Sequence, residues 1–279
     1  MIRVLSFCLC FLPLATAFSH GDLHEHIARV SAQIQTNQAD PDLWLLRAEL
    51  YRLHGEFSHA HADLDRASRL KADPASVSLV RARIYFDAAD FLRAEIVASR
   101  CLKLRPANID AHVLRARSRV KSNRIRSAIT DYDVVLNTTN GNPPLPDLYV
   151  ERARAQAALK RYADAIAGLD AGRKRIGDTP SLALPAIEYE RARGTCDAAL
   201  SRLEAARRFM SKEEYSATHG EILLQANRFS EAYETFQSGL ALLADMPPAR
   251  RTLSLTIDVE KRLRRGLTQA GEHLVFLNR

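Results

Sequence analysis

The sequence predicts an all-α protein that is built as an array of antiparallel helix pairs. Three sets of positions support this, because each recurs six times at intervals of 34, 34, 37, 34 and 33 residues. A small residue marks each copy, an apolar residue precedes it by three positions, and a mostly small residue precedes it by twelve. A period of 34 residues is typical of a helix–turn–helix repeat. The three sets are Ala60, Ala94, Ala128, Ala165, Ala199 and Ala232; Phe57, Phe91, Ile125, Tyr162, Cys196 and Phe229; and Ala48, Ala82, Ala116, Ala153, Ile187 and Gly220.

The composition is that of a folded chain with a moderate positive charge. Of the 279 residues, 47% are apolar, which is enough for a sizeable core and excludes a disordered protein. The length allows one or two globular domains or a single extended array. The formal net charge of +7 indicates anionic partners only weakly, because a solvated surface usually explains such a surplus. We therefore expect no nucleic-acid partner.

Residues 1–17 have the pattern of a secretory signal peptide. Arg3 precedes an apolar run over residues 4–14, and residues 15–17 offer a small-x-small cleavage site. The run is shorter than the roughly 20 residues that span a bilayer, and no later window is apolar enough to span one. We expect the mature chain to begin at Phe18, with cleavage before His20 as an alternative. The prediction is an exported protein, periplasmic or secreted, without a transmembrane segment.

Four cysteines are divided between the leader and the array. Cys8 and Cys10 belong to the leader and would be lost with it, and neither follows the small residue of a lipoprotein site. Cys101 and Cys196 occupy packing positions of different repeats, so we expect small apolar side chains without a disulfide between them.

The segments follow one another in a simple order. Residues 18–40 predict a single helix whose face carries Leu23, Ile27, Val30 and Ile34, and which covers the open end of the array. Residues 41–245 hold about six repeats. Ser58 is expected to cap the second helix of the first repeat. In the fifth repeat, Pro185 requires a helix that starts nearby, and the phase of Ala199 places residues 191–193 next to the turn.

Residues 246–279 predict one capping helix. Its apolar stripe is expected to contain Leu253, Ile257, Leu263, Leu267 and Leu274. A terminal helix with a polar outer face hides the last apolar surface of a repeat array. The basic residues beside the stripe leave contact with an anionic membrane surface as an alternative.

The repeats resemble the tetratricopeptide repeat over residues 41–245. In the first copy the resemblance rests on Trp44, Ala48, Tyr51, Phe57, Ala60, Leu64 and Ala67; in the second it rests on Ala82, Tyr85, Phe91, Ala94, Leu104 and Pro106. The resemblance implies a right-handed superhelix in which the first helix of each pair lines a concave groove. It also implies a scaffold that binds a protein or peptide, without catalysis.

The resemblance assigns particular residues to the groove. One set follows the first small residue of each repeat, and a second set lies one helical turn further on. An acidic segment or a free C-terminus would suit the arginines in the middle of the groove, because guanidinium binds carboxylate through two hydrogen bonds. The alternative is that these arginines pair with carboxylates of neighbouring repeats. The first set is Glu49, Arg83, Arg117, Arg154, Glu188 and Glu221; the second is Arg52, Phe86, Asp87 and Lys121.

One subfamily holds the C-terminal carboxylate of heat-shock chaperones with a lysine and asparagines on the groove. Here Leu45 and Glu49 stand at the corresponding places. This difference argues against chaperone-tail binding.

No catalytic motif or cofactor-binding loop is present, so we expect neither an enzyme nor a bound cofactor. Histidines give the alternative function. His20, His24 and His26 lie close together at the expected mature N-terminus, and imidazole is a ligand for zinc or copper. Three more, His54, His59 and His61, lie around the first turn. The two groups would meet if the N-terminal helix docks on the first repeat.

Overall fold

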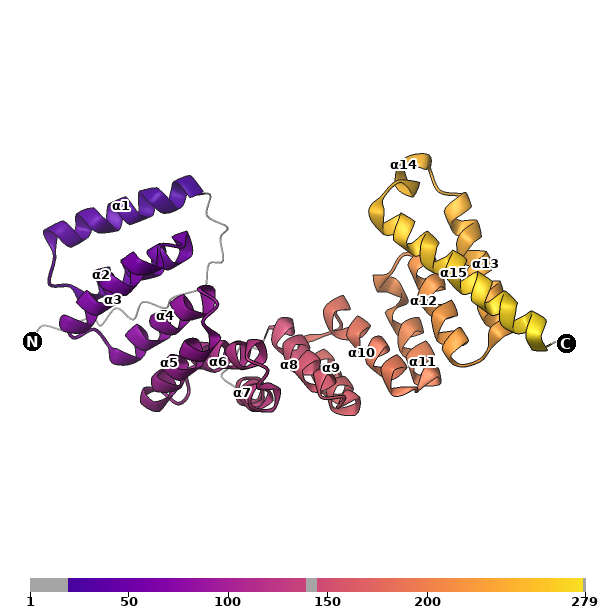
Figure 1. The fold of residues 1–279 in the computed structure, drawn as a ribbon, viewed down its shortest axis with the longest axis horizontal. Helices are drawn as coiled ribbons and strands as arrows, with labels where there is room; N and C mark the ends of the chain where they lie inside the picture. Colours follow the sequence, from indigo (N-terminus) through magenta and orange to yellow (C-terminus); the bar gives the residue numbers. More distant parts are fainter. Residues whose placement is uncertain (1–19, 139–144, 278–279) are drawn as a thin grey trace, which may run out of the picture. The chain divides into compact units, whose positions relative to one another are not determined.

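The computed structural model describes residues 20–138 and 145–277, and within them it contains fifteen α-helices and no strand. The predicted leader, with Cys8 and Cys10, lies outside the described residues. The chain divides into two compact units between Leu114 and Arg115, inside one helix, and each unit is described by itself. Helices follow one another as antiparallel pairs in both units (Figure 1). This confirms the predicted all-α repeat fold.

The helix bounds follow the 34-residue period. The N-terminal unit holds α1 (His20–Thr36), α2 (Pro41–His54), α3 (Phe57–Arg69), α4 (Pro74–Asp87), α5 (Phe91–Leu104) and the first half of α6 (Ile109–Lys121). The C-terminal unit holds the rest of α6, α7 (Ile125–Asn137), α8 (Pro146–Ala158), α9 (Tyr162–Ile176), α10 (Pro180–Arg193), α11 (Cys196–Ala206), α12 (Lys212–Gln225), α13 (Phe229–Ala244), α14 (Pro248–Arg251) and α15 (Ser254–Leu277).

In the N-terminal unit, α1 lies along α2 and buries the stripe that the sequence predicts. Leu23, Val30 and Ile34 are buried against Leu50 of α2. Beneath them, the small residues Ala48 and Ala60 are fully buried, which brings α2 and α3 close together.

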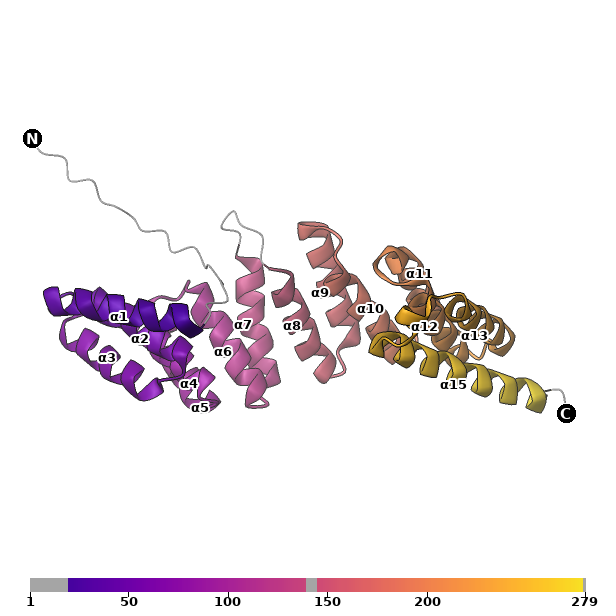
Figure 2. The ribbon, with the colours of Figure 1, turned by 90° about the horizontal axis from the view of Figure 1, so that it is seen from above.

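In the C-terminal unit, α15 packs on α12 and α13 (Figure 2). Phe236 of α13 and Leu263 of α15 are fully buried there. The Phe236 ring fills the space beside Gly220, where a Cβ would lie 2.5 Å from Cε1 of the ring. This explains why the sixth repeat has glycine at a position where four other repeats have alanine.

The turn inside each repeat has one residue in the left-handed conformation, always at the same repeat position. Only glycine adopts this conformation without steric cost, and asparagine tolerates it better than most residues. The chain uses glycine twice and asparagine twice, but an alanine and a lysine occupy the second and fourth copies. These residues are Gly55, Ala89, Asn123, Lys160, Gly194 and Asn227, with φ between 58° and 84°.

Arginine–aspartate ion pairs join the helices in an alternating pattern. In repeats one and three, the arginine of the first helix binds an aspartate of its own repeat: Arg47 binds Asp63, and Arg115 binds Asp131. In repeats two and four, Val97 and Gly168 stand at that aspartate position. There the arginine binds the preceding repeat, as Arg81 does to Asp65 and Arg152 does to Asp133, at 2.7 Å each.

Several local expectations need correction or refinement. Glu56 precedes the first residue of α3, so Ser58 lies inside the first turn and does not cap the helix. In α10, the helix begins at Pro180, which places Pro185 near its start, and residues 191–193 end it beside Gly194.

The C-terminal segment differs more from expectation. A break at Thr252 and Leu253 separates α14 from α15 where one helix was expected. Leu253, which lies in the break, and Ile257, in the first turn of α15, are exposed rather than part of the buried stripe. Cys101 and Cys196 are free thiols. Among the described residues, no helix is both long and apolar enough to cross a membrane.

Candidate functional site

The charged groove residues predicted in the N-terminal unit form a continuous chain of ion pairs. Glu49 accepts two hydrogen bonds of 3.0 Å from Arg52, one turn along α2. Arg83 of α4 reaches back to Glu49 at 3.1 Å and forward to Asp110 of α6 at 2.7 Å. Arg52 also pairs with Asp87. Both arginines that were assigned to the groove here are therefore neutralised by carboxylates of neighbouring repeats.

Burial and charge act in opposite directions on Arg52. Its side chain is only 15% exposed, and burial lowers the pKa of a guanidinium. The hydrogen bonds and charges of Glu49 and Asp87 outweigh this, so the pKa of Arg52 is raised. Phe86 of α4, also assigned to the groove, is half-buried with its ring against Phe91 at 5.4 Å between centroids.

In the C-terminal unit, Arg117 of α6 makes a two-point bond to Glu151 of α8, at 3.0 and 2.8 Å. The buried hydroxyl of Tyr132 donates to the same carboxylate at 2.9 Å. Burial and the charge of Glu151 raise the pKa of Tyr132, so the hydroxyl keeps its proton. Glu151 thus accepts three hydrogen bonds, and the Arg117–Glu151 bond ties α6 to α8 on the predicted groove face.

Lys121 and Arg154 differ from the other predicted cations. Lys121 lies four residues after Arg117 on α6, and Arg154 lies three residues after Glu151 on α8. Because each spacing is about one helical turn, Lys121 and Arg154 lie on the same helix faces as the two bonded residues. Both side chains are exposed, and within the described residues neither takes part in an ion pair.

The repeat pattern explains why Arg154 is unpaired. Asp110 lies 27 residues after Arg83 and binds it. Asp147 stands at the same repeat position as Asp110, 37 residues later, and its charge acts on Arg117. The residue 27 positions after Arg154 is Ser181, which has no charge. Burial raises the pKa of Tyr189 in α10, and the positive charge of Arg154 opposes part of that rise.

The histidines form a different arrangement from the predicted group. α1 docks on α2, and Nε2 of His24 lies 3.1 Å from Nε2 of His54. Nδ1 of His54 lies 2.6 Å from a carboxylate oxygen of Glu56, whose other oxygen lies 2.7 Å from Nδ1 of His59. The side chain of His20 is outside the described part of the chain. In the part that is described, no three potential metal ligands gather at one point, so His24 and His26 do not form a three-ligand site there.

Comparison with solved structures decides the fold. The C-terminal part of a TPR repeat-containing protein from Cytophaga hutchinsonii matches with a TM-score of 0.65 over 85% of this chain and 94% of that one, at 14% identity. The chain has the tetratricopeptide-repeat fold. A tetratricopeptide repeat protein from Parabacteroides merdae matches with a TM-score of 0.52 over 88% and 93% of the two chains, at 14% identity. PilW, described as a widely conserved type IV pilus biogenesis factor, matches with a TM-score of 0.55 over 67% and 86%, at 16% identity.

Sequence comparison adds less. No family model matches the chain. DnaJ homolog subfamily C member 3 from Gallus gallus is 30% identical over 127 residues. That match covers 41% of this tetratricopeptide-repeat chain and 24% of the relative's length, so the chain spans about a quarter of that protein.

Proposed function

We propose that this protein is a non-catalytic scaffold that binds an acidic segment of a partner protein on the face formed by α6 and α8. The observation that carries the proposal is the pair of exposed cations, Lys121 and Arg154, which have no ion-pair partner among the described residues. The other cation assigned to this face, Arg117, is bound to Glu151 of the chain itself.

The chemistry of the two side chains fits carboxylates. Arg154 offers a planar fork that binds a carboxylate through two hydrogen bonds, and Lys121 offers a compact charge. Glu151 lies between them in sequence but is already neutralised by Arg117, so it repels an incoming anion little. A glutamate- or aspartate-rich segment, or a peptide C-terminus beside such residues, is the expected partner.

A defined peptide tests this proposal. Fluorescence anisotropy would measure the binding of a labelled hexaglutamate peptide to the wild-type chain, to K121E/R154E and to R126E/K212E. Both variants change the net charge equally, but Arg126 and Lys212 are exposed residues of α7 and α12 without an ion pair among the described residues. We expect at least about tenfold weaker binding in K121E/R154E and a small change in the control. Equal losses in both variants would reduce the effect to net charge and refute the site.

The contact between His24 and His54 supports a second candidate, the binding of a single zinc or copper ion. Two nitrogen ligands of a tetrahedral zinc ion, each about 2.0–2.1 Å from the metal, lie roughly 3.3 Å apart, close to the 3.1 Å observed here. A carboxylate on the far nitrogen of a ligating histidine orients the ring, and Glu56 occupies that place on His54.

Calorimetric titration of the mature chain with zinc or copper would test this candidate. H24A/H54A should remove the binding heat, whereas H26A should retain it. If H26A abolishes the heat and H54A does not, the N-terminal histidines bind the metal without α2.

We also propose that the chain is exported, on the pattern of residues 1–17. Mass spectrometry of the protein secreted by its own cell type would identify the new N-terminus. We expect Phe18, and retention of residues 1–17 would contradict export by this route.

A further inference from the structure

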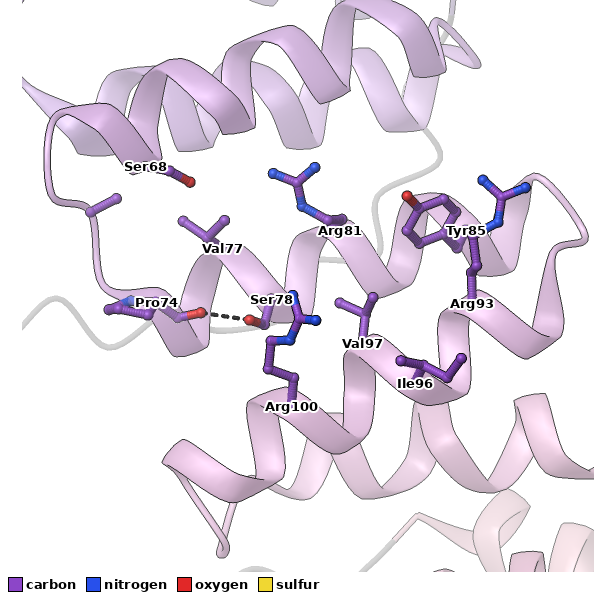
Figure 3. Close-up of a pocket in the computed structure, with 11 residues that line it drawn as sticks. Ser68, Pro74, Val77, Ser78, Arg81, Tyr85, Arg93, Ile96, Val97 and Arg100 are labelled. Atoms are coloured by element: carbon purple, nitrogen blue, oxygen red, sulfur yellow. Dashed lines mark hydrogen bonds between the residues drawn. The ribbon is translucent and has the colours of Figure 1, made fainter.

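A hollow of about 530 Å³ lies on α4 between α3 and α5, all within the N-terminal unit (Figure 3). Arg81 and Arg83 are two residues apart on α4 and therefore project on nearly opposite sides of the helix. Arg83 belongs to the predicted groove, whereas Arg81 lines the hollow. The hollow is thus separate from the groove, and its volume lies in the range of small-molecule sites, about 300–1,000 Å³.

The walls combine an apolar floor with a positive rim. Val77 of α4 and Val97 of α5 form part of the floor, and Ile96 stands beside them with 60% of its surface exposed. Arg93 and Arg100 project from α5 (Figure 3). They are seven residues apart, about two helical turns, and therefore lie on one face of that helix. None of the described residues that line the hollow is acidic.

The three arginines of the rim, Arg81, Arg93 and Arg100, differ in whether they form ion pairs with other residues of the chain. Arg81 binds Asp65 at 2.7 Å, and Arg93 binds Asp90 at 2.6 Å while its side chain stays 66% exposed. Arg100 is exposed and has no ion pair within the residues that the structure describes. The rim therefore carries more positive than negative charge.

Tyr85 lies at one end of the hollow, held by two neighbours. Its ring is 5.1 Å from that of His61, and the guanidinium of Arg93 lies over its face at 5.3 Å. Burial lowers the pKa of His61, and the charges of Arg81 and Arg93 lower it further, against the charge of Asp65, which raises it.

The arginines of α5 are not part of the repeat architecture. At the positions equivalent to Arg93 and Arg100, the third repeat has Ser127 and Val134, and the fourth has Asp164 and Ala171. These repeats fold in the same way without the two cations, so packing does not explain why the second repeat has them.

We propose that this hollow binds a small amphipathic anion, with a carboxylate or phosphate head on Arg81, Arg93 and Arg100 and a short apolar body on Val77, Ile96 and Val97. The guanidinium groups supply charge-assisted hydrogen bonds to the head. The aliphatic floor removes the body from water, which favours binding by about 25 cal/mol for each Å² buried. A fully hydrophilic anion uses only half of this surface, and an uncharged alcohol uses only the other half.

Calorimetric titration with octanoate and octyl phosphate tests the proposal, with octanol and inorganic phosphate as comparison ligands. We expect octanoate or octyl phosphate to bind the wild-type chain with one-to-one stoichiometry, and R93Q/R100Q to weaken this at least tenfold. The matched control is R69Q/K103Q, which removes two exposed cations of the same unit that do not line the hollow. I96S, a change at an exposed position, should weaken both eight-carbon anions without affecting the fold.

Three results would overturn the proposal: no binding of either eight-carbon anion, equal weakening in R93Q/R100Q and R69Q/K103Q, or binding of inorganic phosphate as tight as that of octyl phosphate. Circular dichroism on each variant checks that the helices are retained. Binding of hexaglutamate to R93Q/R100Q reports on α6 and α8 separately, so failure here leaves the proposed scaffold function standing.

Discussion

Two regions with the same repeat positions use their cations differently. On α2 and α4 of the N-terminal unit, Arg52 and Arg83 are both bound by carboxylates of adjacent helices. On α6 and α8 of the C-terminal unit, Arg117 is bound in the same way, but Lys121 and Arg154 are not. A repeat position therefore does not determine whether an arginine stabilises the array or is available to a ligand. What decides it is whether the neighbouring helices place a carboxylate beside it, as Glu49 and Asp110 lie beside Arg83 and Glu151 lies beside Arg117.

The largest expected effect is on stability in the N-terminal unit. Glu49→Gln removes the carboxylate that Arg52 and Arg83 share, and should lower the free energy of unfolding by about 2 kcal/mol, since Arg52 is mostly buried. Urea denaturation followed by circular dichroism measures this. Glu188→Gln is the matched control at the same repeat position; that side chain is 59% exposed, so a loss below about 0.5 kcal/mol is expected. Similar losses in both variants would show that the shared network on α2 and α4 has no special role.

A single substitution should give Arg154 of the C-terminal unit a carboxylate partner, like the one that Arg83 has in the N-terminal unit. Ser181→Asp restores the acid that repeats three and four have at this position, and it should pair with Arg154. We expect about three- to tenfold weaker binding of hexaglutamate, measured by anisotropy, because the added carboxylate competes for the cation. Ser181→Asn is the uncharged control. Unchanged binding in S181D would mean that Arg154 does not contact the peptide.

The turns should respond alike in both regions, because their geometry is shared. Ala89 and Lys160 have φ values of 59° and 58°. Replacing either with glycine removes a steric cost, and after the entropic cost of glycine a net gain of about 0.5–1 kcal/mol is expected. Thermal unfolding measures the gain, and peptide binding should not change. A loss of stability at either position would contradict the left-handed turn there.

The smallest effect concerns the side of α4 away from the groove. Because burial and nearby cations lower the pKa of His61 in the folded chain, the unfolded chain binds the additional proton more readily. Stability should therefore fall as the pH drops below about 6.5, the ordinary pKa of histidine. Arg93→Gln should raise the pKa of His61 in an NMR titration, whereas Arg69→Gln should leave it in place. An unchanged value in R93Q would place Arg93 too far away to matter.

The fold was predictable from the sequence because close helix packing restricts the residues that pack. Alanine recurs wherever two helix backbones approach each other, as at Ala60 and Ala94, and the period alone locates the helix pairs. The break between α14 and α15 was not predictable in this way, since Leu253 and Ile257 have the spacing of a buried stripe and yet are exposed.

The candidate sites were predictable only in part. The list of groove residues followed from the repeat phase. The same phase places Asp110 in the repeat after Arg83 and Ser181 at the equivalent position after Arg154, so it also distinguishes a paired arginine from an unpaired one. The sequence predicts that the two histidine groups meet if the N-terminal helix docks on the first repeat. It does not predict Glu56 as the partner of His54, because it suggests Ser58 as the start of the following helix. The hollow on α4 does not follow from the repeat period, since it depends on arginines of the second repeat that have no equivalents in the third and fourth repeats.

The alternating arginine–aspartate pairs have a consequence for how such a chain can change in length. Asp63 and Asp131 lie 68 residues apart, and so do Asp65 and Asp133. Deleting the third repeat alone would place Arg152 after a repeat that has Ser99 where its aspartate should be. Deleting the second and third together would bring Arg152 next to Asp65 and leave each of these arginines with an aspartate. For this protein, the unit that can be deleted or duplicated without leaving one of these arginines unpaired is a pair of repeats.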